Sequence, residues 1–429
     1  MEFGLVKVSR RSLLSQAVGA AIAGGAVAGN QGVAAKSVEP PKRTDDFWSS
    51  IRAEFDTNGD FINLEHGYWT EMARPIREAF ATHTEMINRD GAFYARNQWA
   101  SDKAEIEARL AGYLKCKPTE IALTRNASEA LQALIGGYRP LGRGDAVLHA
   151  DLDYPSVIQD FKSLAASRGA DVVKIEIPEP ATYEGVIQAY EEALEKNPKI
   201  KLLVLTHVSN QTGLVVPVKE IIQRARANGV DVIVDAAHSW GQLDYSINDL
   251  DADFIAFNLH KWIGAPIGVG FVYIREDRLS DIARNISQGP SMEDKTAGRV
   301  YFGTMNFATA LTVHDALDYN DRIGWSEMSA HLRSLRDVWA EPARSVPGVE
   351  VLTPTDKRLA GAITSFRLAG RTSADENAAL ANRLIEEFGI YTVFRPHPAK
   401  GACVRVTPAL SNSPEDSEKL LAALRAIAG

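Results

Sequence analysis

The stretch 231–262 reads DVIVDAAHSWGQLDYSINDLDADFIAFNLHKW and holds two apolar runs, each followed by polar residues. The first run ends at Asp235, and the second is followed by Lys261. Short, near-continuous runs of this kind are typical of strands that are buried on both faces of a parallel sheet. In open α/β sheets, functional groups lie beyond the carboxyl ends of the strands. We therefore expect Asp235 and Lys261 to lie near each other at one edge of a sheet.

The pairing of these two residue types indicates a particular chemistry. A carboxylate at a buried strand end needs a cation or a hydrogen-bond donor, because burying it alone is costly. A lysine in a desolvated site can lose its proton and form a Schiff base with a carbonyl compound. An aspartate followed by a lysine on the next strand, 26 residues later, suggests a pyridoxal phosphate site. In such a site, the aspartate pairs with the nitrogen of the cofactor ring.

The sequence on both sides of this stretch predicts an α/β fold. Short β-branched runs alternate with amphipathic stretches, which indicates βαβ units and a mainly parallel, seven-stranded sheet. The predicted strands are Glu120–Thr124, Ala146–His149, Asp171–Ile177, Lys201–His207, Asp231–Asp235, Asp253–Asn258 and Val269–Ile274. The predicted helices between them are Ser128–Tyr138, Tyr154–Ser167, Val186–Lys196 and Val218–Asn228.

The pattern changes after about residue 310, where long helical stretches and shorter strands predict a second, α+β domain. The predicted elements there are Ala308–Ile323, Trp325–Val346, Gly361–Leu368, Asp375–Phe388, Tyr391–Phe394, Ala402–Thr407 and Glu415–Ala428. We assign residues 75–310 to a large cofactor-binding domain and residues 311–429 to a smaller C-terminal domain. Residues 36–74 are expected to pack with the small domain, and their polar first part, 36–60, is expected to be an extended lead-in.

Residues 1–35 have the layout of a secretory signal. Basic residues that include Arg10 and Arg11 precede a run rich in Ala and Gly, and small-residue patterns follow it. The hexapeptide Ser9-Arg10-Arg11-Ser12-Leu13-Leu14 resembles a twin-arginine signal. We expect export of the folded protein to the periplasm by the twin-arginine machinery, without stable membrane association after cleavage. A short amphipathic helix or a retained anchor is the alternative.

The composition argues against several classes of protein. The chain has 429 residues and a formal net charge of −8, which disfavours non-specific binding to nucleic acid. Two cysteines, Cys116 and Cys403, are too few for a disulfide-rich scaffold or a four-cysteine metal site. No His-x-x-x-His pattern is present, so we expect no metal. Glycine patterns for a dinucleotide site and for a serine hydrolase elbow are absent as well.

Three further segments follow predicted strands and carry candidate cofactor ligands. Ala127 and Ser128 lie where the N-terminus of a helix can hold a phosphate, although a plain N-cap is the alternative. Tyr154 can stack on a flat ring, or it can be a buried core residue. Asn210 can donate a hydrogen bond to a phenolic oxygen, or it can be a turn residue.

The order of these segments is similar to that in class V aminotransferases, which have the type I fold of pyridoxal phosphate-dependent transferases. The motifs are Asn126-Ala127-Ser128, Tyr154, 207–213, 235–239, 258–262 and Gly303-Thr304. Within this family, Asn63-Leu64-Glu65-His66-Gly67, Asp153-Tyr154-Pro155 and 258–262 resemble most the isopenicillin N epimerase-like branch. Exported members of that branch modify a siderophore side chain in the periplasm.

The resemblance implies pyridoxal phosphate as the cofactor and a role for each matching residue. Lys261 would hold the cofactor covalently, and Asp235 would pair with the ring nitrogen. His238 and Asn210 would lie near the phenolic oxygen, and Tyr154 would stack on the ring. The residues expected to hold the phosphate are Ala127 and Ser128, with Asn258 or His260.

The resemblance also implies a substrate side and a partner subunit. Arg405 would clamp the α-carboxylate of the substrate, which suits a bidentate guanidinium. Asn63, His66 and Gly67 would line the substrate side. Gly303 and Thr304 would reach the phosphate of a neighbouring subunit, which implies a homodimer with shared active sites.

Several reactions remain open on these residues. We expect a small amino-acid or peptide-derived substrate and its epimerisation or oxidative modification at Cα. An aminotransferase and a cysteine desulfurase or lyase are the enzymatic alternatives, and a pyridoxal phosphate-fold binding protein is the non-enzymatic one. A desulfurase needs a nucleophilic cysteine on a mobile loop, whereas Cys403 lies in a predicted strand.

Overall fold

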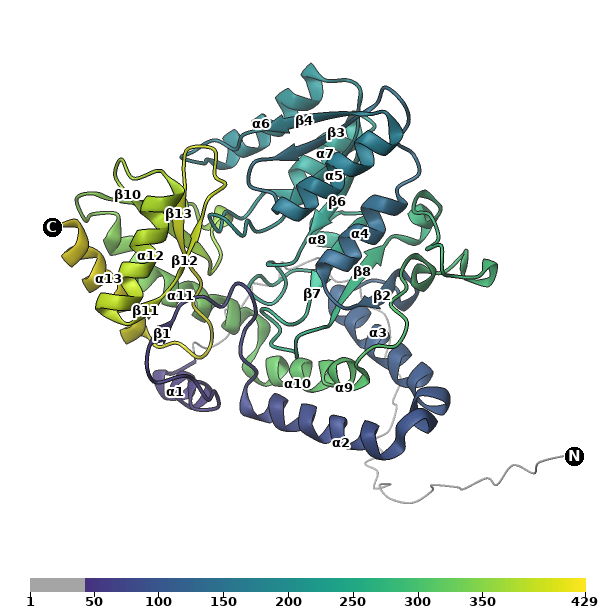
Figure 1. The fold of residues 1–429 in the computed structure, drawn as a ribbon, viewed down its shortest axis with the longest axis horizontal. Coiled ribbons are helices and arrows are strands. Elements are labelled where there is room, and N and C mark those ends of the chain that lie inside the picture. The colour runs from purple at the N-terminus through teal and green to yellow at the C-terminus, as the bar shows by residue number, and fades with distance from the viewer. Residues whose placement is uncertain (1–42) are drawn as a thin grey trace, which may run out of the picture. The chain divides into compact units, whose positions relative to one another are not determined.

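The computed structural model describes residues 43–429 (Figure 1). The expected signal at 1–35 and the first residues of the segment 36–74 lie outside the described residues. The described residues fall within one compact unit. No helix in this part of the chain is both long enough and apolar enough to cross a membrane.

A seven-stranded sheet forms the centre of the fold, with the strand order β2-β8-β7-β6-β5-β3-β4. Only β8 runs antiparallel to its neighbours, so the predicted, mainly parallel sheet is confirmed. The strands are β2 (Ile121–Thr124), β3 (Ala146–Ala150), β4 (Asp171–Ile175), β5 (Ile200–Thr206), β6 (Asp231–Asp235), β7 (Phe254–Asn258) and β8 (Gly270–Ile274).

Alternate residues of each central strand enter two different hydrophobic cores. On β7, Phe254 and Ala256 belong to one core, and Ile255 and Phe257 belong to the other. Successive strand residues point to opposite faces, so a sheet covered on both sides needs apolar residues at every position. The helices that follow the strands are α4 (Ala127–Gly137), α5 (Pro155–Arg168), α6 (Tyr183–Lys196), α7 (Val218–Ala227) and the short α8 (Ile247–Leu250).

A smaller sheet lies in the C-terminal part of the chain, among the yellow and green elements of Figure 1. Its order is β12-β13-β10-β9, and each pair of neighbours is antiparallel. The strands are β9 (Val349–Val351), β10 (Thr364–Leu368), β12 (Val393–Arg395) and β13 (Cys403–Val406). The helices of this part are α10 (Val313–Ile323), α11 (Trp325–Ala343), α12 (Ala374–Phe388) and α13 (Pro414–Ala428). The domain boundary at residue 310 stays a prediction.

The segment before the large sheet pairs with the C-terminal part. Strand β1 (Ile62–Asn63) runs parallel to β11 (Ile390–Tyr391), and Glu65 forms an isolated bridge with Thr407. Strand β1 therefore enters the fold beside residues that lie more than 300 positions later in the chain.

Several local features differ from the sequence-based expectations, most clearly in the helices. Residues 45–52 form helix α1 and not an extended lead-in, because the Thr44 hydroxyl accepts a hydrogen bond from the Phe47 amide and caps the helix. The helix expected at 308–323 is divided into α9 (Phe307–Leu311) and α10 at Thr312, whose hydroxyl donates to the Ala308 carbonyl. Helices α2 (Arg74–Asn97) and α3 (Trp99–Leu114) were not predicted.

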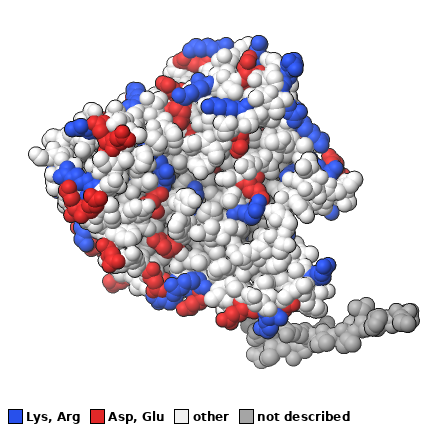
Figure 2. Space-filling view, viewed as in Figure 1, with Lys and Arg blue, Asp and Glu red and all other residues white. Residues whose placement is uncertain are grey.

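Charged side chains of both signs are interspersed on the face drawn in Figure 2. Most of them lie towards the outline of that face, and its central area is largely uncharged. Such a mixed surface has no strong field of one sign on this face, in keeping with the net charge of −8.

Candidate active site

Lys261 lies three residues beyond β7, and Asp235 is the last residue of the neighbouring strand β6. The Lys261 Nζ atom lies 2.9 Å from Nε2 of His238, within hydrogen-bond distance. Asp235 and His238 are only 4% and 5% exposed. The carboxyl ends of β6 and β7 therefore bring together the lysine, the aspartate and the histidine that the sequence singled out.

Burial controls the protonation of this cluster. It lowers the pKa of Lys261 to about 7; the nearby Asp235 carboxylate opposes this shift, and the guanidinium groups of Arg405 and Arg395 add to it. Burial also lowers the pKa of His238 well below its ordinary value, and Lys261 contributes to that shift. Near neutral pH, the Lys261 amine is thus partly uncharged beside a neutral imidazole, as a nucleophilic lysine requires.

The Asp235 carboxylate is held by the backbone that follows it. Its Oδ1 atom accepts a hydrogen bond of 2.9 Å from the Ala237 amide. Burial raises the pKa of this carboxyl group, whereas the Ala237 amide and the charge of Lys261 favour its ionised form. A buried carboxylate with few partners is suited to binding a cationic N–H group.

The N-terminus of α4 is partly occupied by its own side chains. The Asn126 side chain caps the helix by accepting from the Glu129 amide, and Asn258 Oδ1 accepts from the Ala127 amide at 2.7 Å. The plain N-cap alternative is therefore realised at Asn126, and the Ala127 amide is engaged. Ser128 is partly exposed, and the phosphate-binding role expected of Ala127, Ser128 and Asn258 stays a prediction.

Three other predicted cofactor ligands lie at ends of the large sheet's strands or in their following loops. Tyr154 precedes α5 and is 40% exposed, so it is not the buried core residue that was the alternative. Asn210 lies beyond β5 and is 7% exposed. His260 lies beyond β7, and burial followed by the charge of Lys261 lowers its pKa to about 4.

Arg405 on β13 reaches the same region from the small sheet and is 1% exposed. Its Nη1 atom donates to the Asn210 carbonyl at 2.9 Å, and its Nη2 atom contacts the Glu65 carboxylate. The predicted carboxylate clamp is therefore already paired with a carboxylate of the protein itself.

Gly67 is packed against this guanidinium. A Cβ atom at Gly67 would lie 2.4 Å from Arg405 Nη2, which is closer than van der Waals contact allows. We expect Gly67→Ala to displace the Arg405 side chain and to weaken binding of a small carboxylate about tenfold or more. Calorimetric titration of the variant measures this. Gly59→Ala is the matched control, since nothing lies within 4 Å of a Cβ there; equal losses in both variants would contradict the expectation.

Asn63 and His66 are tied together by a separate set of contacts. His66 Nδ1 lies 2.8 Å from Glu71 Oε2, and Asn63 Nδ2 donates to Glu71 Oε1 at 3.0 Å. Although burial opposes it, the His66 contact lowers the pKa of Glu71 to about 2. Asn63 also accepts from the Glu65 amide. These residues therefore brace the turn that carries Glu65 and Gly67.

Gly303 and Thr304 are not brought to this cluster by any contact within residues 43–429. Both are exposed, and Gly303 has a φ of +64°. Their expected role at a neighbouring subunit stays a prediction.

Two residues of the site, Glu65 and Arg395, were missed as candidates by the sequence analysis. Arg395 Nη2 lies 3.5 Å from Glu65 Oε1, so Glu65 stands between two arginines. Glu65 was quoted only as part of a motif, and Arg395 lies on a three-residue strand without a recognisable pattern.

Asp153 was also missed, although it lies just before Tyr154. It is 1% exposed, and its carboxyl group accepts from the Ala150 amide and from the Thr206 amide and hydroxyl. Burial raises its pKa to about 7. Asp153 thus joins the ends of β3 and β5 beneath the loop that carries Tyr154.

Both cysteines are free thiols, and neither has the properties of a sulfur carrier. Cys403 is fully buried on β13, where burial raises its pKa to about 12. Burial raises the pKa of Cys116 to about 12 as well. A reactive cysteine needs an accessible thiolate, so neither cysteine is suited to nucleophilic sulfur chemistry.

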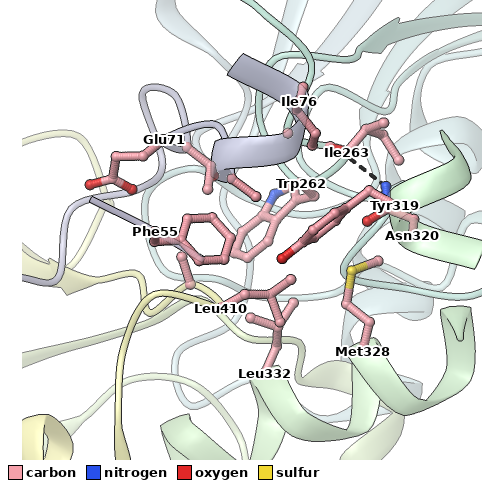
Figure 3. A pocket seen from close by; sticks show the side chains of 14 residues that line it. Phe55, Glu71, Ile76, Trp262, Ile263, Tyr319, Asn320, Met328, Leu332 and Leu410 are labelled. Carbon is pink, nitrogen blue, oxygen red and sulfur yellow. Dashed lines mark hydrogen bonds between the residues drawn. The ribbon is translucent and has the colours of Figure 1, made fainter. Parts of the chain in front are cut away.

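A small pocket lies behind the turn that carries Lys261 (Figure 3). Phe55, Trp262 and Tyr319 line it, and Asn320 Nδ2 donates to the Ile263 carbonyl at 3.0 Å. Its lining includes neither Lys261 nor Asp235. The pocket therefore lies next to the turn that carries Lys261 but is not lined by the predicted catalytic side chains.

The residues present fit the predicted cofactor. His238 Nδ1 is buried without a hydrogen-bond partner in the protein, although its ring lies against Lys261. Asp235 offers a buried carboxylate for a ring N–H group, and Ser128 offers a helix terminus for a phosphate. Across residues 43–429, no group of three or more His, Cys, Asp or Glu side chains is placed to hold a metal ion.

Comparison with known proteins gives one family and several relatives. Residues 76–406 match the aminotransferase class-V family. An isopenicillin N epimerase of Amycolatopsis lactamdurans is 28% identical over 400 residues, which cover 88% of this chain and 98% of the epimerase. The isopenicillin N epimerase of Streptomyces clavuligerus is 28% identical, and the alignment covers 89% of this chain and 98% of that epimerase. A probable cysteine desulfurase of Vibrio cholerae is 26% identical, and the alignment covers 87% of this chain and 97% of that desulfurase.

Solved structures of similar fold include two enzymes of sulfur chemistry. The apo cysteine desulfurase of Thermococcus onnurineus has a TM-score of 0.75 and 22% identity, and covers 89% of this chain and 98% of that one. A cystine C–S lyase in complex with cysteine persulfide has a TM-score of 0.73 and 24% identity, and the match covers 86% of this chain and 98% of the lyase. At these identities the likeness shows the fold.

Proposed function

The chain belongs to the class V aminotransferase family of pyridoxal phosphate-dependent enzymes, and we propose that it modifies the Cα centre of an amino acid or a peptide-derived substrate. Within the family, we propose an isopenicillin N epimerase-like reaction, that is, epimerisation or oxidative modification. The epimerases of two organisms support this choice, since each aligns with the chain over nearly its whole length.

The observation that carries the proposal is the contact between Lys261 and His238 beside Asp235. A lysine with a pKa of about 7 can carry the cofactor and, once released, act as a base near neutral pH. When bound, pyridoxal phosphate supplies an electron sink for negative charge that develops at Cα. Asp235 would keep the ring nitrogen protonated, and Ser128 would fix the phosphate.

The residues around the lysine would orient the substrate and move its protons. Lys261 Nζ would take the proton from Cα, and the neutral His238 ring would hold Nζ in position by their 2.9 Å contact. The cationic guanidinium of Arg405 favours the neutral form of Lys261 Nζ and would attract a substrate carboxylate. Epimerisation would need a second acid on the opposite side of Cα; oxidative modification would not.

The alternatives differ in what they require. An aminotransferase would need a keto-acid partner, and a binding protein would not need a reactive lysine. A desulfurase of the kind that uses a cysteine nucleophile is disfavoured by the buried Cys403 thiol, whose pKa is about 12. A lyase that uses no protein cysteine remains a candidate, because one solved structure of similar fold is a cystine C–S lyase.

Reaction in D2O separates these candidates. Purified protein with pyridoxal phosphate would be given L-amino acids and short peptides, and Cα deuteration and chirality would be followed by mass spectrometry and chiral chromatography. Deuterated product of mixed chirality is expected for an epimerase. Loss of CO2 or a keto product without racemisation would point to oxidative modification or transamination instead. Unchanged substrate throughout would contradict an enzymatic role.

The pKa of Lys261 predicts the pH dependence of cofactor attachment. Since only the neutral amine attacks an aldehyde, we expect the rate of attachment to cofactor-free protein to rise as the pH passes about 7. The rate would be followed by the change in cofactor absorbance after mixing. A midpoint near about 10.4, the ordinary value for an exposed lysine, would contradict the expectation.

We further propose that the protein is exported to the periplasm by the twin-arginine machinery. The pattern Ser9-Arg10-Arg11-Ser12 and the apolar run that follows it support this proposal. An export assay of the variant with Arg10→Lys and Arg11→Lys tests it, and the variant is expected to remain in the cytoplasm. Export at the normal level would overturn the twin-arginine assignment.

We also propose a homodimer with shared active sites, on the basis of the family resemblance at Gly303 and Thr304. The exposed positions of Gly303 and Thr304 leave both residues available to a second copy of the chain. Sedimentation equilibrium should give twice the mass of the chain, and a Thr304→Ala variant should bind the cofactor more weakly. A monomer that retains full activity would refute the shared site.

A further inference from the structure

The turn that carries His238 is supported by one fully buried side chain, that of Gln242. Gln242 lies four residues after His238 in the chain, and its Nε2 atom donates to the His238 carbonyl. Its Oε1 atom accepts from the Ala362 amide at 2.9 Å. A backbone N–H group can only donate and a carbonyl can only accept, so the two contacts together fix which way the carboxamide points.

The far end of this bridge is held in turn by helix α11. Arg336 donates through Nη1 to the Gly361 carbonyl, and Ser329 Oγ donates to the Gln242 carbonyl at 2.7 Å. Ser329 and Arg336 both belong to α11, and both are buried. Gln242 therefore links the turn after β6 of the large sheet to α11 and to the residues that lead into β10 of the small sheet.

Little space remains around this turn. A Cβ atom at Gly361 would lie 2.6 Å from Gln242 Oε1. A Cβ atom at Gly241 would lie 2.7 Å from the Cβ atom of Trp262, the residue that follows Lys261. The turn 238–242 is thus packed against the segment before β10 and against the lysine turn. In a closely packed interior, a displacement at one of these contacts is passed on to the other.

The near end of the bridge is the contact between His238 and the reactive lysine. His238 Nε2 lies 2.9 Å from Lys261 Nζ. Among residues 43–429, the other ring nitrogen, Nδ1, has no hydrogen-bond partner. The orientation of the ring therefore depends on the backbone that carries it, and the carbonyl of that backbone unit is the one that Gln242 binds.

We propose that Gln242 is a positioning residue of the active site, whose carboxamide transmits the position of Gly361 and Ala362 to the His238 turn and so holds the His238 ring against Lys261 Nζ. The proposal rests on the proposed function, in which Lys261 carries the cofactor and moves the proton at Cα. Gln242 acts through His238 and takes no part in the proton transfer itself.

The rate of cofactor attachment to cofactor-free protein tests the proposal, because attachment requires the Lys261 amine but not the proposed reaction. Gln242→Met keeps a long, unbranched side chain but cannot join the His238 carbonyl to the Ala362 amide. The released turn should admit water to Lys261 and weaken the desolvation that lowers its pKa. The pH midpoint of attachment should therefore rise by about one unit from its wild-type value of about 7.

The charged groups that act on Lys261 are left in place by this substitution: Asp235, Arg405, Arg395 and Glu65. A shift of the midpoint therefore reports the position and hydration of the lysine. In the D2O assay, kcat of Gln242→Met should fall about 10- to 100-fold, the loss expected when a reacting group is misplaced by a small distance. The KM should change little, because the substrate side of the site is untouched.

Ser329→Ala is the matched control. It removes a buried hydrogen bond to the same residue, but at the Gln242 carbonyl and not at the carboxamide. The variant should have a lower Tm, with the midpoint and kcat of the wild type. Gln242→Met protein that has only a lower Tm, with an unchanged midpoint and kcat, would overturn the proposal. An equal shift of the midpoint in Ser329→Ala would overturn it as well.

Gly361→Ala reaches the bridge from its far side and decides the question if Gln242→Met does not fold. The substitution leaves Gln242 in place, but the new Cβ atom displaces Oε1. The midpoint should again rise, whereas Gly136→Ala, where nothing lies within 4 Å of a Cβ atom, should match the wild type. A wild-type midpoint in folded Gly361→Ala protein would contradict the proposal.

These results also separate the proposal from the proposed function. If Gln242→Met shifts the midpoint but the wild type shows no reaction in D2O, the proposed reaction is wrong and the positioning role remains. If the wild type reacts but Gln242→Met and Gly361→Ala both behave like it, only the positioning role is wrong.

Discussion

Replacing Lys261 by alanine is expected to remove covalently bound pyridoxal phosphate and to lower turnover about 10⁴- to 10⁶-fold, the range found when a covalent catalytic group is deleted. Lys261 Nζ is the amine that lies against His238 and has a pKa of about 7, so its loss removes both the predicted nucleophile and the predicted base. Borohydride reduction followed by mass spectrometry of the intact chain would show whether the cofactor is attached. Turnover would be measured in the D2O assay.

The matched control is Lys174→Ala. Lys174 is on β4 at the edge of the large sheet, is about half exposed, and makes only a long ion pair of 3.7 Å with Glu176. Its loss should leave both cofactor attachment and turnover unchanged. If the Lys261→Ala protein still carries the cofactor on a lysine after borohydride reduction, the attachment site has been assigned wrongly.

Replacing Asp235 by asparagine is the second large change. The side chain keeps its shape and an oxygen for the Ala237 amide, but it loses the charge that would stabilise a protonated ring nitrogen. Removing one preorganised electrostatic partner in a buried site costs about 10²- to 10³-fold in turnover. We expect a loss of that size in kcat, while the cofactor stays covalently attached.

The pH dependence of Asp235→Asn provides a second readout. Because the Asp235 carboxylate raises the pKa of Lys261, its removal should move the midpoint of cofactor attachment to lower pH. Asp251→Asn, at an exposed ion pair with Arg226, is the control and should change neither quantity. An unchanged kcat in Asp235→Asn would show that the carboxylate does not act on the cofactor ring.

The cluster at the sheet edge could be predicted because the sequence itself places its residues. Asp235 and Lys261 follow two adjacent apolar strands, and parallel strands bring their carboxyl ends to the same edge. His238 is close to Asp235 in sequence, so it follows the same strand end. The order of these residues along the chain is therefore sufficient to predict that their side chains lie together.

The ion pairs of Glu65 with Arg395 and Arg405 could not be predicted in the same way. Glu65 and Arg405 are 340 positions apart, and they meet only because the bridge at Thr407 fixes the register between their segments. Arg395 depends on the pairing of β12 with β13, and its short strand has no periodicity to read. Contacts of this kind follow from tertiary packing, which single-sequence patterns do not contain.

The phosphate-binding role of Ala127 and Ser128 stays a prediction, but one contact at that helix terminus could not be read from the sequence. The sequence places Ala127 at the start of a helix, but it does not reveal that Asn258, from the neighbouring strand end, accepts a hydrogen bond from the same amide. Helix α1 was missed because Thr44 is a common residue in polar segments, and its capping role depends on the helix that follows it.

The pairing of β1 with β11 has a consequence for the order in which the molecule is made. A chain grows on the ribosome from its N-terminus, so Ile62 emerges long before its partner Ile390 is synthesised. Residues 62–65 therefore wait without their native neighbours until the last strands of the small sheet have left the exit tunnel. During that interval, the growing chain exposes apolar residues such as Leu64, which is fully buried in the finished protein, to chaperones and proteases.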